Sequence, residues 1–495
     1  MMALSLSEPG LLLSSLLGVP VLLFLFVLGY AATFHSHRVD GTKVPPGSFW
    51  LFPWIGETLH ALSLPPQEFF NQKTKKYGIT FSTHVMGTPT ILSSDVELTK
   101  TVYQQTNKLF DLALPSTTAS ILGKESLFFM KADIHKKVRN LIKVPFSVKE
   151  LESFIPSIDR TCQNVTASWK NQEQIRVYHE AKKYVLNIAW NYLITIDTQS
   201  YPYMDKMLED VPGATQIEKL AHLYFTTQSG MMALPFRIPG LKYYKALNSR
   251  KKIQEVLKQV IADRRSGEVE CKDFLQSLLL PMEDGSLLTD DQVMDNIFTL
   301  LGASDVTTST CLVWMVKNIH ENPKVYKDMK AELDAIKKSK PEGELLTLED
   351  LKKMTITTWT MNETLRMINV VGWFFGRTSD KDVQIKDVAI PKNWVIGLTH
   401  MFHLDERYFP EPEKFNPYRF EKTPMPFTFT PFGQGCRTCP GKDLARFEIL
   451  TFFYHLITNY SWEPVEPNEG TCWHPFPHPE HLHPVKLTPR HLGDN

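Results

Sequence analysis

The sequence predicts a mainly helical protein with a small β-sheet lobe and one N-terminal membrane-spanning helix. An uncharged N-terminal segment precedes a proline-rich stretch and then a long globular part. Apolar residues recur there with a period near 3.6, as on amphipathic helices. This periodicity covers residues 134–146, 174–196, 250–264, 288–318, 325–338, 351–368 and 440–459. Strand-like runs are confined to residues 79–92 and 369–425, so a small sheet built from two distant stretches is expected beside the helices.

The composition excludes several classes of protein. The 495 residues include 54 Lys and Arg against 54 Asp and Glu, so the chain lacks the positive charge that a nucleic-acid partner requires. A hydrophobic content of 43% excludes a disordered chain. Six cysteines are too few for a disulfide scaffold in a chain of this length. They suit a reducing compartment and leave room for one functional thiolate.

The first 56 residues predict an anchor and a spacer. Residues 10–34 carry no charge, and 25 residues at about 1.5 Å each exceed the roughly 30 Å hydrocarbon core of a bilayer. A basic leader is missing and Glu8 stands in front, which favours a retained anchor over a cleaved signal peptide. Basic residues follow the span, which keeps the later chain in the cytosol. We therefore expect an anchor over residues 1–34, a proline-rich linker over 35–56 and a cytosolic catalytic domain over 57–495.

The strongest chemical signal is a glycine-rich loop before the last helical run. Residues 431–441 read Pro-Phe-Gly-Gln-Gly-Cys-Arg-Thr-Cys-Pro-Gly, with fixed positions at Phe432, Gly435, Arg437, Cys439 and Gly441. Glycines let a backbone approach a flat cofactor, and backbone N–H groups can donate to a thiolate sulfur. Arg437 can pair with a carboxylate such as a haem propionate. Cys439 stands just before a helix, which biases it toward the thiolate.

Cys436 and Cys439 also form a Cys-x-x-Cys pair, which is a second interpretation of the same loop. Such a pair serves redox chemistry or supplies half of a zinc site. A second Cys-x-x-Cys pair is missing from the sequence, and the surrounding pattern does not suit a βαβ redox fold. The haem interpretation is therefore preferred.

This loop resembles the haem-binding loop of the cytochrome P450 superfamily, and the resemblance to its membrane-anchored eukaryotic members runs from the anchor to the C-terminus. It implies the cytochrome P450 fold and haem b with Cys439 as the axial iron ligand. It further implies electrons from NADPH-cytochrome P450 reductase and insertion of one oxygen atom from O2 into a C–H bond. The implied location is the endoplasmic reticulum membrane, with a single span and the catalytic domain facing the cytosol.

Two further sets of charged residues match elements of that family. Glu363 and Arg366 stand at i and i+3 on a helix, and with Arg419 they resemble a buried three-charge network that fixes the loop under the haem. Arg139 and His135 resemble the segment that meets the haem carboxylates, and Arg377 resembles a further propionate partner. As bare patterns, these residues would equally suit solvated helix faces.

The long helix over 288–318 departs from the family at its oxygen-activation motif. In Ala303-Ser304-Asp305-Val306-Thr307-Thr308 the threonine position falls on Thr307, the candidate catalytic residue for proton delivery. Val306 occupies the position of the usual acid. Asp305 lies one residue early and is rotated by about 100° around the helix. We expect proton delivery to use Asp305, water or a substrate hydroxyl instead.

A narrower resemblance is to the plant cytochromes P450 that hydroxylate steroids and terpenoids, with the brassinosteroid and phytosteroid side-chain (C-22) hydroxylases as the nearest group. It rests on residues 234–246, 369–372, 429–433 and 444–446. The apolar, proline-bearing segment 234–240 suits a substrate-entry lid that rests on the membrane. The expected substrate is therefore an apolar steroid or sterol drawn from the bilayer.

Several alternatives stay open. The substrate could be a diterpenoid or triterpenoid, Val306 favours an O2-independent haem-thiolate isomerase or dehydratase, and a non-catalytic haem or steroid-binding protein is the third class. Gln434 and Cys436 depart from the residue types that the family favours. The tail over 472–484 carries four histidines, but its intervening prolines hinder a shared metal site. By resemblance, this tail is a C-terminal hairpin that reaches the active site.

Overall fold

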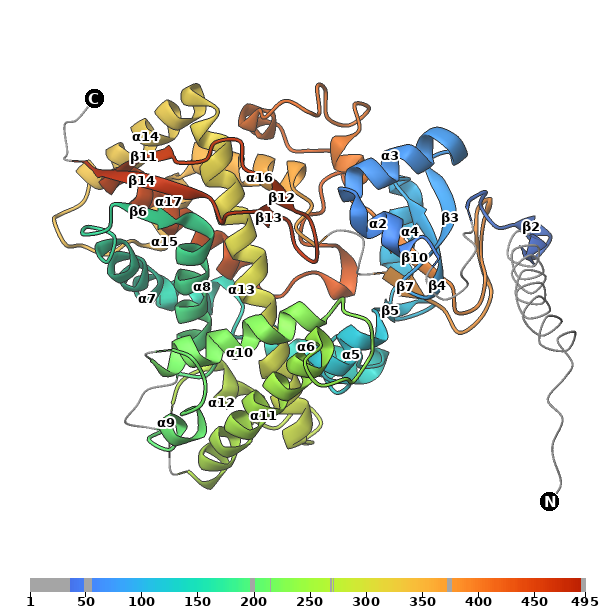
Figure 1. The fold of residues 1–495 in the computed structure, drawn as a ribbon, viewed down its shortest axis with the longest axis horizontal. Coiled ribbons are helices and arrows are strands. Elements are labelled where there is room, and N and C mark those ends of the chain that lie inside the picture. The colour runs from blue at the N-terminus through green and yellow to red at the C-terminus, as the bar shows by residue number, and fades with distance from the viewer. Residues whose placement is uncertain are drawn as a thin grey trace, which may run out of the picture. The chain divides into compact units, whose positions relative to one another are not determined.

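The computed structural model describes residues 36–48, 56–195, 201–213, 215–267, 269, 271–371 and 376–490 (Figure 1). The predicted anchor over 1–34 lies outside these residues, as does part of the 35–56 linker. The chain divides into two compact units. The first comprises Met1–Ala113 and Phe375–Met401, and the second comprises Leu114–Phe374 and Phe402–Asn495.

The first unit is built on a five-stranded sheet with the strand order β3-β4-β10-β7-β5. Its strands are β3 (Thr80–Val85), β4 (Thr88–Ser93), β5 (Asp111–Ala113), β7 (Gly376–Thr378) and β10 (Val395–Leu398). β4 and β10 pair in parallel, with Ile91 opposite Ile396, and the other neighbours are antiparallel. A small sheet that joins two distant stretches is therefore confirmed, and β5 adds a strand from outside both of them. The remaining elements of the unit are α2 (Thr58–Ser63), α3 (Pro66–Tyr77), α4 (Val96–Gln105), β1 (Arg38–Val39), β2 (Thr42–Lys43), β8 (Val383–Ile385) and β9 (Val388–Ile390).

The proline-rich stretch lies along β3 in extended conformation. The N–H of Ser82 donates to the Pro46 carbonyl at 2.9 Å, and the N–H of Ser48 donates to the Ser82 carbonyl at 3.2 Å. A Cβ atom at Gly47 would stand 1.8 Å from the Ser82 carbonyl oxygen. Only glycine fits this approach, so the stretch is held against the sheet at a fixed place.

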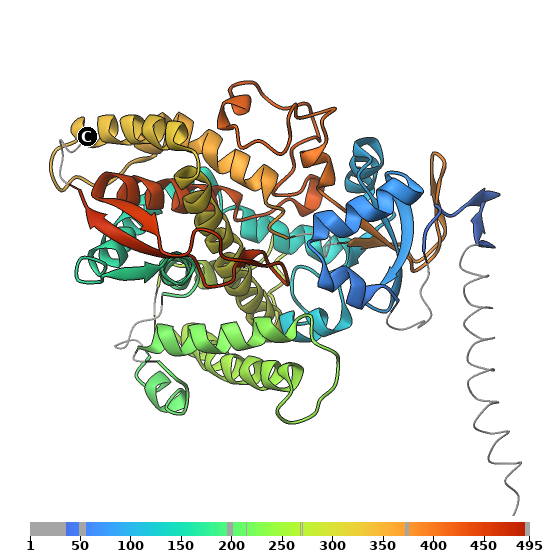
Figure 2. The ribbon, with the colours of Figure 1, turned by 45° about the horizontal axis from the view of Figure 1, so that its top comes forward.

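The second unit is mainly helical and is centred on α13 (Asp290–His320), the long yellow helix of Figures 1 and 2. A capping box between Thr289 and Gln292 fixes its start. It packs against α8, α11, α16 and α17. Within the described part of the chain it is the one helix long and apolar enough to cross a membrane, but 72% of its most apolar window is buried inside the protein. It is therefore the core helix of this unit.

The other helices of the second unit surround α13. They are α5 (Ser116–Leu122), α6 (Ala132–Lys143), α7 (Val148–Ala167), α8 (Val177–Leu193), α9 (Met204–Met207), α10 (Gln216–Gly230), α11 (Lys242–Ser266), α12 (Phe274–Leu278), α14 (Pro323–Lys338), α15 (Leu348–Lys353), α16 (Thr355–Met367) and α17 (Lys442–Asn459). The predicted helix over 351–368 is two helices, because Met354 leaves helical geometry with ψ at 65°. The periodicity did not indicate α3, α4, α7 or α10.

Short strands and 3₁₀ turns complete the second unit. A three-stranded sheet has the order β11-β14-β6, and β12 pairs with β13 in the C-terminal hairpin. The bounds are β6 (Gln174–Arg176), β11 (Tyr460–Pro464), β12 (Thr471–Cys472), β13 (His478–Pro479), β14 (Pro484–Pro489), η2 (Pro417–Glu421) and η3 (Gly435–Arg437). The mainly α fold class is therefore confirmed.

Candidate active site

The loop that carries Cys439 is closed by its own backbone. The N–H of Cys439 donates to the Phe432 carbonyl at 2.9 Å, and the N–H of Gly433 donates to the Thr430 carbonyl at 2.9 Å. Gly433 and Gly435 have φ values of 68° and 75°, in the left-handed region that favours glycine. The loop then runs directly into α17, for which Gly441 is the N-cap.

The electrostatic surroundings of the Cys439 thiol act in opposite directions. Desolvation by the surrounding protein raises its pKa, while a hydrogen bond from the Gly441 backbone N–H and the Arg139 guanidinium act to lower it. Desolvation prevails, so the pKa lies above the ordinary value. The expected bias toward the thiolate is therefore not a property of the polypeptide alone. Coordination to a metal deprotonates such a thiol outright.

Arg437 fastens the loop to the segment before α6. Its guanidinium donates to the carbonyl oxygens of Leu127 at 2.8 Å, Phe128 at 3.2 Å and Met130 at 3.0 Å. Arg139, on α6, donates to the Thr438 carbonyl at 2.5 Å. The loop is thus held from both sides by cationic side chains.

His135 and Arg139 make this region strongly cationic. Burial lowers the pKa of His135 to about 3, with Arg437 and Arg139 lowering it further through charge repulsion, so the imidazole is neutral near pH 7. Burial also lowers the pKa of Arg139, and the groups that act to raise it are the Cys439 and Cys436 thiols. The Arg139 guanidinium therefore lies in a desolvated region beside the Cys439 and Cys436 thiols, and an anion bound there would offset the cost of burying its charge.

Arg377 lies in β7 of the first unit. Its Nε donates to Thr106 Oγ1 at 3.2 Å and its Nη1 donates to the Gly376 carbonyl at 3.0 Å. Its guanidinium also lies 6.0 Å from the centre of the Tyr103 ring. A role toward haem carboxylates stays a prediction for this residue.

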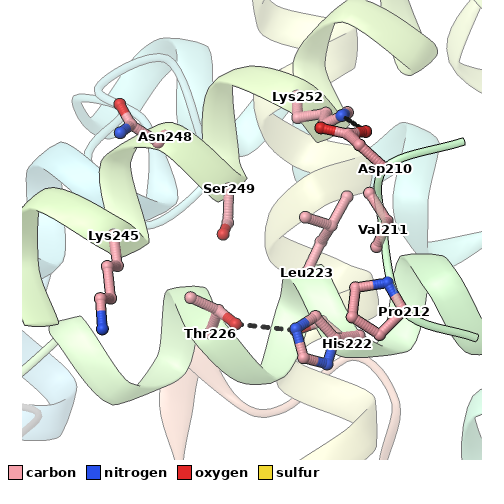
Figure 3. Close-up of a pocket in the computed structure, with 10 residues that line it drawn as sticks. All are labelled: Asp210, Val211, Pro212, His222, Leu223, Thr226, Lys245, Asn248, Ser249 and Lys252. Atoms are coloured by element: carbon pink, nitrogen blue, oxygen red, sulfur yellow. Dashed lines mark hydrogen bonds and ion pairs between the residues drawn. The ribbon is translucent and has the colours of Figure 1, made fainter. Parts of the chain in front are cut away.

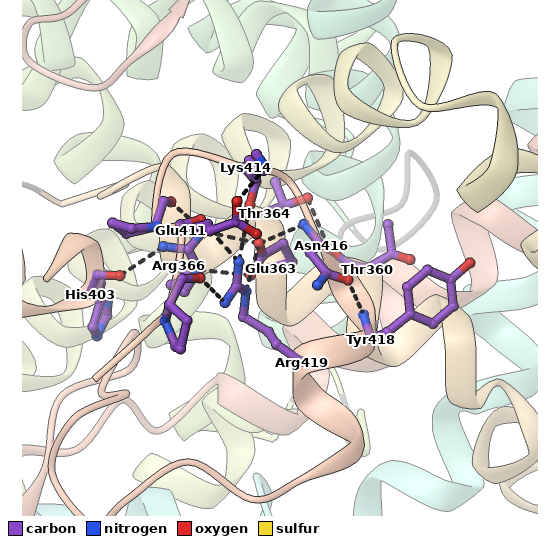
Figure 4. Close-up of polar contacts among 12 residues, drawn as sticks. Thr360, Glu363, Thr364, Arg366, His403, Glu411, Lys414, Asn416, Tyr418 and Arg419 are labelled. Carbon is purple, nitrogen blue, oxygen red and sulfur yellow. Dashed lines mark hydrogen bonds and ion pairs between the residues drawn. The ribbon is translucent and has the colours of Figure 1, made fainter. Parts of the chain in front are cut away.

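The structure brings Glu363, Arg366 and Arg419 together (Figure 4). Arg366 donates from Nε to Glu363 Oε2 at 2.7 Å and from Nη2 to Glu363 Oε1 at 2.9 Å. Arg419 Nε and the Asn416 N–H also donate to Glu363 Oε1, at 3.1 and 2.8 Å. The Glu363 and Arg366 side chains are fully buried. Remaining guanidinium donors meet the carbonyls of His403, Pro410, Glu411, Pro412 and Lys414.

One stripe of α13 is accessible although the helix is otherwise a core element. Ala303 is exposed, and Leu300, Ser304 and Thr307 are partly exposed. Their spacing of i, i+3, i+4 and i+7 places them on one helix face. The Thr307 hydroxyl donates to the Ala303 carbonyl at 2.8 Å. This face presents two hydroxyl groups among apolar side chains.

Asp305 lies away from that stripe, in a buried ion pair. Its Oδ2 is 3.1 Å from Lys182 Nζ on α8 and accepts a hydrogen bond from Gln228 Nε2 on α10 at 3.3 Å. Burial acts to lower the pKa of Lys182, but the Asp305 carboxylate and the Tyr178 hydroxyl outweigh it, and the pKa is raised. The structure therefore does not bring the two candidate catalytic residues, Thr307 and Asp305, to one face.

Sequence reasoning missed Lys182, Gln228 and a buried carboxyl group on α17. Burial raises the pKa of Glu448 to about 8, while a hydrogen bond with Thr308 of α13 acts to lower it. The Glu448 backbone carbonyl accepts a hydrogen bond from the Tyr184 hydroxyl at 2.9 Å. An acidic residue inside the apolar run 447–457 was the available signal for this group.

The histidines of the C-terminal segment have separate partners. The His478 ring stacks on the Tyr178 ring at 5.1 Å, His483 Nδ1 lies 3.0 Å from Glu469 Oε1, and His481 pairs with Glu466. Trp314 Nε1 on α13 donates to the Pro477 carbonyl at 3.0 Å. The hairpin is therefore attached to α13 and α8, and its reach into the active site stays a prediction.

A separate surface hollow of about 490 Å³ lies at α10, α11 and the preceding loop (Figure 3). It is lined by Asp210, Val211, Pro212, His222, Leu223, Thr226, Lys245, Asn248, Ser249 and Lys252. The lining contains no thiol and none of the predicted haem-binding residues. Its Asp210 and Lys252 already form an ion pair. The hollow is therefore distinct from the candidate active site.

The residues around Cys439 fit a haem group. The sulfur is a soft ligand that receives a backbone hydrogen bond, as metal-bound thiolates do. The Arg139 and Arg437 guanidinium groups suit the haem carboxylates. Glycines at 433 and 435 keep side-chain bulk away from the loop.

Comparison with known proteins decides the family. Residues 45–479 match the Cytochrome P450 family, which is most of the chain. The chain belongs to the cytochrome P450 family. It is therefore a cytochrome P450 monooxygenase that uses haem with cysteine thiolate ligation. The family resemblance stated from the sequence is confirmed.

Similar curated proteins are plant hydroxylases. Abscisic acid 8'-hydroxylase 1 of Arabidopsis thaliana is 34% identical over 466 residues, which cover 94% of this chain and 95% of that protein. Abscisic acid 8'-hydroxylase CYP707A1 of Solanum lycopersicum is 33% identical over 467 residues, or 92% of this chain and 94% of that protein. These relatives do not support the narrower steroid C-22 hydroxylase subtype that the sequence suggested.

A solved structure shows the same fold. The retinoic acid-bound cyanobacterial CYP120A1 superposes with a TM-score of 0.80 at 25% identity, covering 91% of this chain and 100% of that chain. This agreement confirms the predicted cytochrome P450 fold over the catalytic body.

Proposed function

We propose that this cytochrome P450 hydroxylates a terpenoid or terpenoid-derived compound, with Cys439 as the iron ligand. The observation that carries the proposal is the closed Cys439 loop, which places a hydrogen-bonded sulfur beside the guanidinium groups of Arg139 and Arg437. The named activity of the plant relatives supports the substrate class, because abscisic acid is a terpenoid-derived hormone.

When bound, haem supplies O2 activation, to which a thiolate ligand contributes electron density that favours O–O cleavage. The chain's own residues hold and orient it. Arg139, Arg437 and neutral His135 would hold the carboxylates, with Arg377 proposed as a further partner. Phe432 and Gly441 shape the loop on either side of the sulfur. The Glu363 network keeps the chain before this loop in one conformation.

Thr307 is the residue that we propose for proton handling. Its hydroxyl lies on the accessible stripe of α13, where the oxygen can accept a hydrogen bond while its proton is donated to the Ala303 carbonyl. For Asp305 we propose a positioning role, because its carboxylate meets Lys182 and Gln228 on another face. Thr307→Ala should increase peroxide release per NADPH consumed, whereas unchanged coupling would contradict the role of Thr307.

The exposed segment before α11 supports a membrane source for the substrate. Leu234, Phe236 and Ile238 are 68%, 54% and 56% exposed. Such a row of apolar side chains suits contact with a bilayer. We propose that the protein is anchored in the endoplasmic reticulum membrane with its catalytic body in the cytosol, and that NADPH-cytochrome P450 reductase supplies its electrons.

A substrate panel tests the proposed activity. Membranes containing this protein and the reductase would be incubated with NADPH and with abscisic acid, diterpenoids, triterpenoids and sterols. Mass spectrometry should find a terpenoid product that has gained one oxygen atom and that requires NADPH. If only sterols were oxidised, the result would favour the steroid side-chain (C-22) hydroxylation that the sequence resemblance indicates. The reduced protein with carbon monoxide bound should show the red-shifted Soret band of thiolate ligation. The Cys439→Ser variant should lack this band.

Val306 favours a second candidate function, an isomerase or dehydratase that needs no O2. A valine side chain cannot donate a proton, so the usual route to O–O cleavage is weakened at this position. In that case a rearranged or dehydrated product would form without NADPH. Product formation that stops when NADPH is withheld eliminates this alternative.

A further inference from the structure

The accessible stripe of α13 carries a serine one turn before Thr307. Ser304 and Thr307 are both partly exposed, and their i, i+3 spacing makes them neighbours on the helix surface, with Cβ atoms about 5–6 Å apart. Between them in sequence, Asp305 and Val306 are buried at 1% and 3% exposure. The two hydroxyls are therefore the polar side chains that this part of α13 presents on its accessible face.

Both hydroxyls use their proton within the helix. Ser304 Oγ donates to the Leu301 carbonyl at 2.9 Å, and Thr307 Oγ1 donates to the Ala303 carbonyl at 2.8 Å. A hydroxyl oxygen also has two acceptor lone pairs. Because each proton is directed back at the helix, the lone pairs are directed toward the accessible face. The pair therefore suits a hydrogen-bond donor and not an acceptor.

The two α13 residues between Ser304 and Thr307 do not supply such a donor. Val306 is apolar, and the Asp305 carboxylate is committed to Lys182 and Gln228 on another face. Leu300 and Ala303 complete an apolar frame around the two oxygens. Two acceptor oxygens one helix turn apart define where an incoming donor can bind. A donor that reached this face would therefore be held at a defined place next to Thr307.

We propose that Ser304 and Thr307 together form an acceptor site for one O–H group on the accessible face of α13, next to the position of the missing acid. The O–H group comes from an ordered water or from a hydroxyl of the terpenoid substrate. A water has two protons, so it can donate one to this pair and keep the other for a second acceptor on the accessible face, which is the part that an acid at position 306 would play. A substrate hydroxyl would instead be oriented by the pair, so that Ser304 helps to determine specificity. The substrate form rests on the proposed function, whereas the water form does not.

Ser309 offers a matched control on the same helix. Its hydroxyl also donates to a helix carbonyl, that of Asp305 at 2.6 Å, but the side chain is fully buried. Ser304→Ala and Ser309→Ala therefore remove the same atoms from the same helix. Only the first removes an accessible acceptor, so general effects on α13 would appear in both variants.

The first arm detects water at the site without any substrate. Carbon monoxide bound to the reduced haem has an infrared stretching band that responds to nearby hydrogen-bond donors. In the haem-loaded full chain, we expect this band to shift between H2O and D2O in the wild type and in Ser309→Ala. Ser304→Ala should lose the isotope shift, and Ser304→Thr, which keeps a hydroxyl, should retain it.

The second arm detects a substrate hydroxyl. The probes are α-ionol and α-ionone, which share a terpenoid skeleton but carry a hydroxyl and a ketone, respectively. Optical titration of the oxidised wild type should show about tenfold tighter binding of α-ionol, in line with one hydrogen bond in an apolar setting. Ser304→Ala should lose this preference, while Ser309→Ala should keep it.

The two arms separate the possible results. If Ser304→Ala loses only the isotope shift of the first arm, the bound O–H group is a water. If Ser304→Ala loses the preference for α-ionol in the second arm, the bound O–H group is a substrate hydroxyl. If Ser304→Ala matches Ser309→Ala in both arms, the acceptor site is overturned. If the wild type oxidises no terpenoid and the isotope shift is nevertheless lost in Ser304→Ala, the proposed substrate class is overturned and the water form is supported.

Discussion

Two arginine clusters of this protein differ in how their charge is balanced. In the first, Glu363 accepts hydrogen bonds from Arg366 and Arg419 through both carboxylate oxygens, and backbone carbonyls take the remaining donors. In the second, Arg139 and Arg437 meet backbone carbonyls, neutral His135 and the thiols of the Cys439 loop. Glu363 supplies the anion of the first cluster, whereas in the second we expect an anionic ligand to bind at Arg139.

The difference separates a structural use of arginine from a ligand-binding use. A guanidinium group whose anion lies inside the fold stabilises the chain, because removing either partner leaves a buried charge uncompensated. A desolvated guanidinium group such as that of Arg139 is stabilised when an anionic ligand binds beside it. Haem carboxylates are the anions that the family supplies. Substitutions in the two clusters should therefore act on different measured quantities.

The largest expected effect is in the first cluster. Glu363→Gln removes the anion from two buried or nearly buried guanidinium groups and should lower the free energy of unfolding by about 3–5 kcal/mol. Denaturant unfolding of the purified protein measures this loss. Glu411→Gln is the control, because Glu411 forms an exposed pair with Lys414 and should change the unfolding free energy by less than about 1 kcal/mol. Equal midpoints for the two variants would show that the network does not stabilise the fold.

Substitutions in the second cluster should change the free energy of unfolding less than those in the first, but should increase the rate of haem release. Arg139→Gln removes a cation from the proposed carboxylate site, and haem should transfer to apomyoglobin about tenfold faster, as for the loss of one charge-assisted hydrogen bond. The control is Lys136→Gln, an exposed residue on the same helix. If both variants release haem at the wild-type rate, Arg139 does not hold the cofactor.

The smallest expected effect is the pH dependence that His135 contributes. Its pKa in the folded protein, about 3, lies below the value of 6.5 expected when the chain is unfolded. The unfolded state therefore binds the additional proton first, and stability is lost as the pH falls below 6.5, with a slope of at most about 1.4 kcal/mol per pH unit. His135→Gln should flatten this part of the profile between pH 4 and 6.5. An unchanged slope would mean that His135 is not buried in its neutral form.

The features that could be predicted from the sequence are those that the spacing of nearby residues determines. The α13 and α17 helices follow from apolar periodicity, and the Cys439 loop follows from fixed residues within eleven positions. The partner of Asp305 did not follow, because Lys182 lies 123 residues away. The carbonyl partners of Arg437 lie 307 to 310 residues away and have no side-chain signature. The substrate subtype was also missed, since short similar segments do not define the residues that contact a substrate.

The Lys182–Asp305 pair restricts the order in which this part of the helix could have changed during evolution. A lineage that lost Asp305 while Lys182 remained would leave an ammonium group buried without its anion. Replacing Asp305 by a neutral residue is therefore compatible with the present core only once position 182 has become neutral. Positions 305 and 182, which lie on two different helices, are thus expected to change together in related sequences.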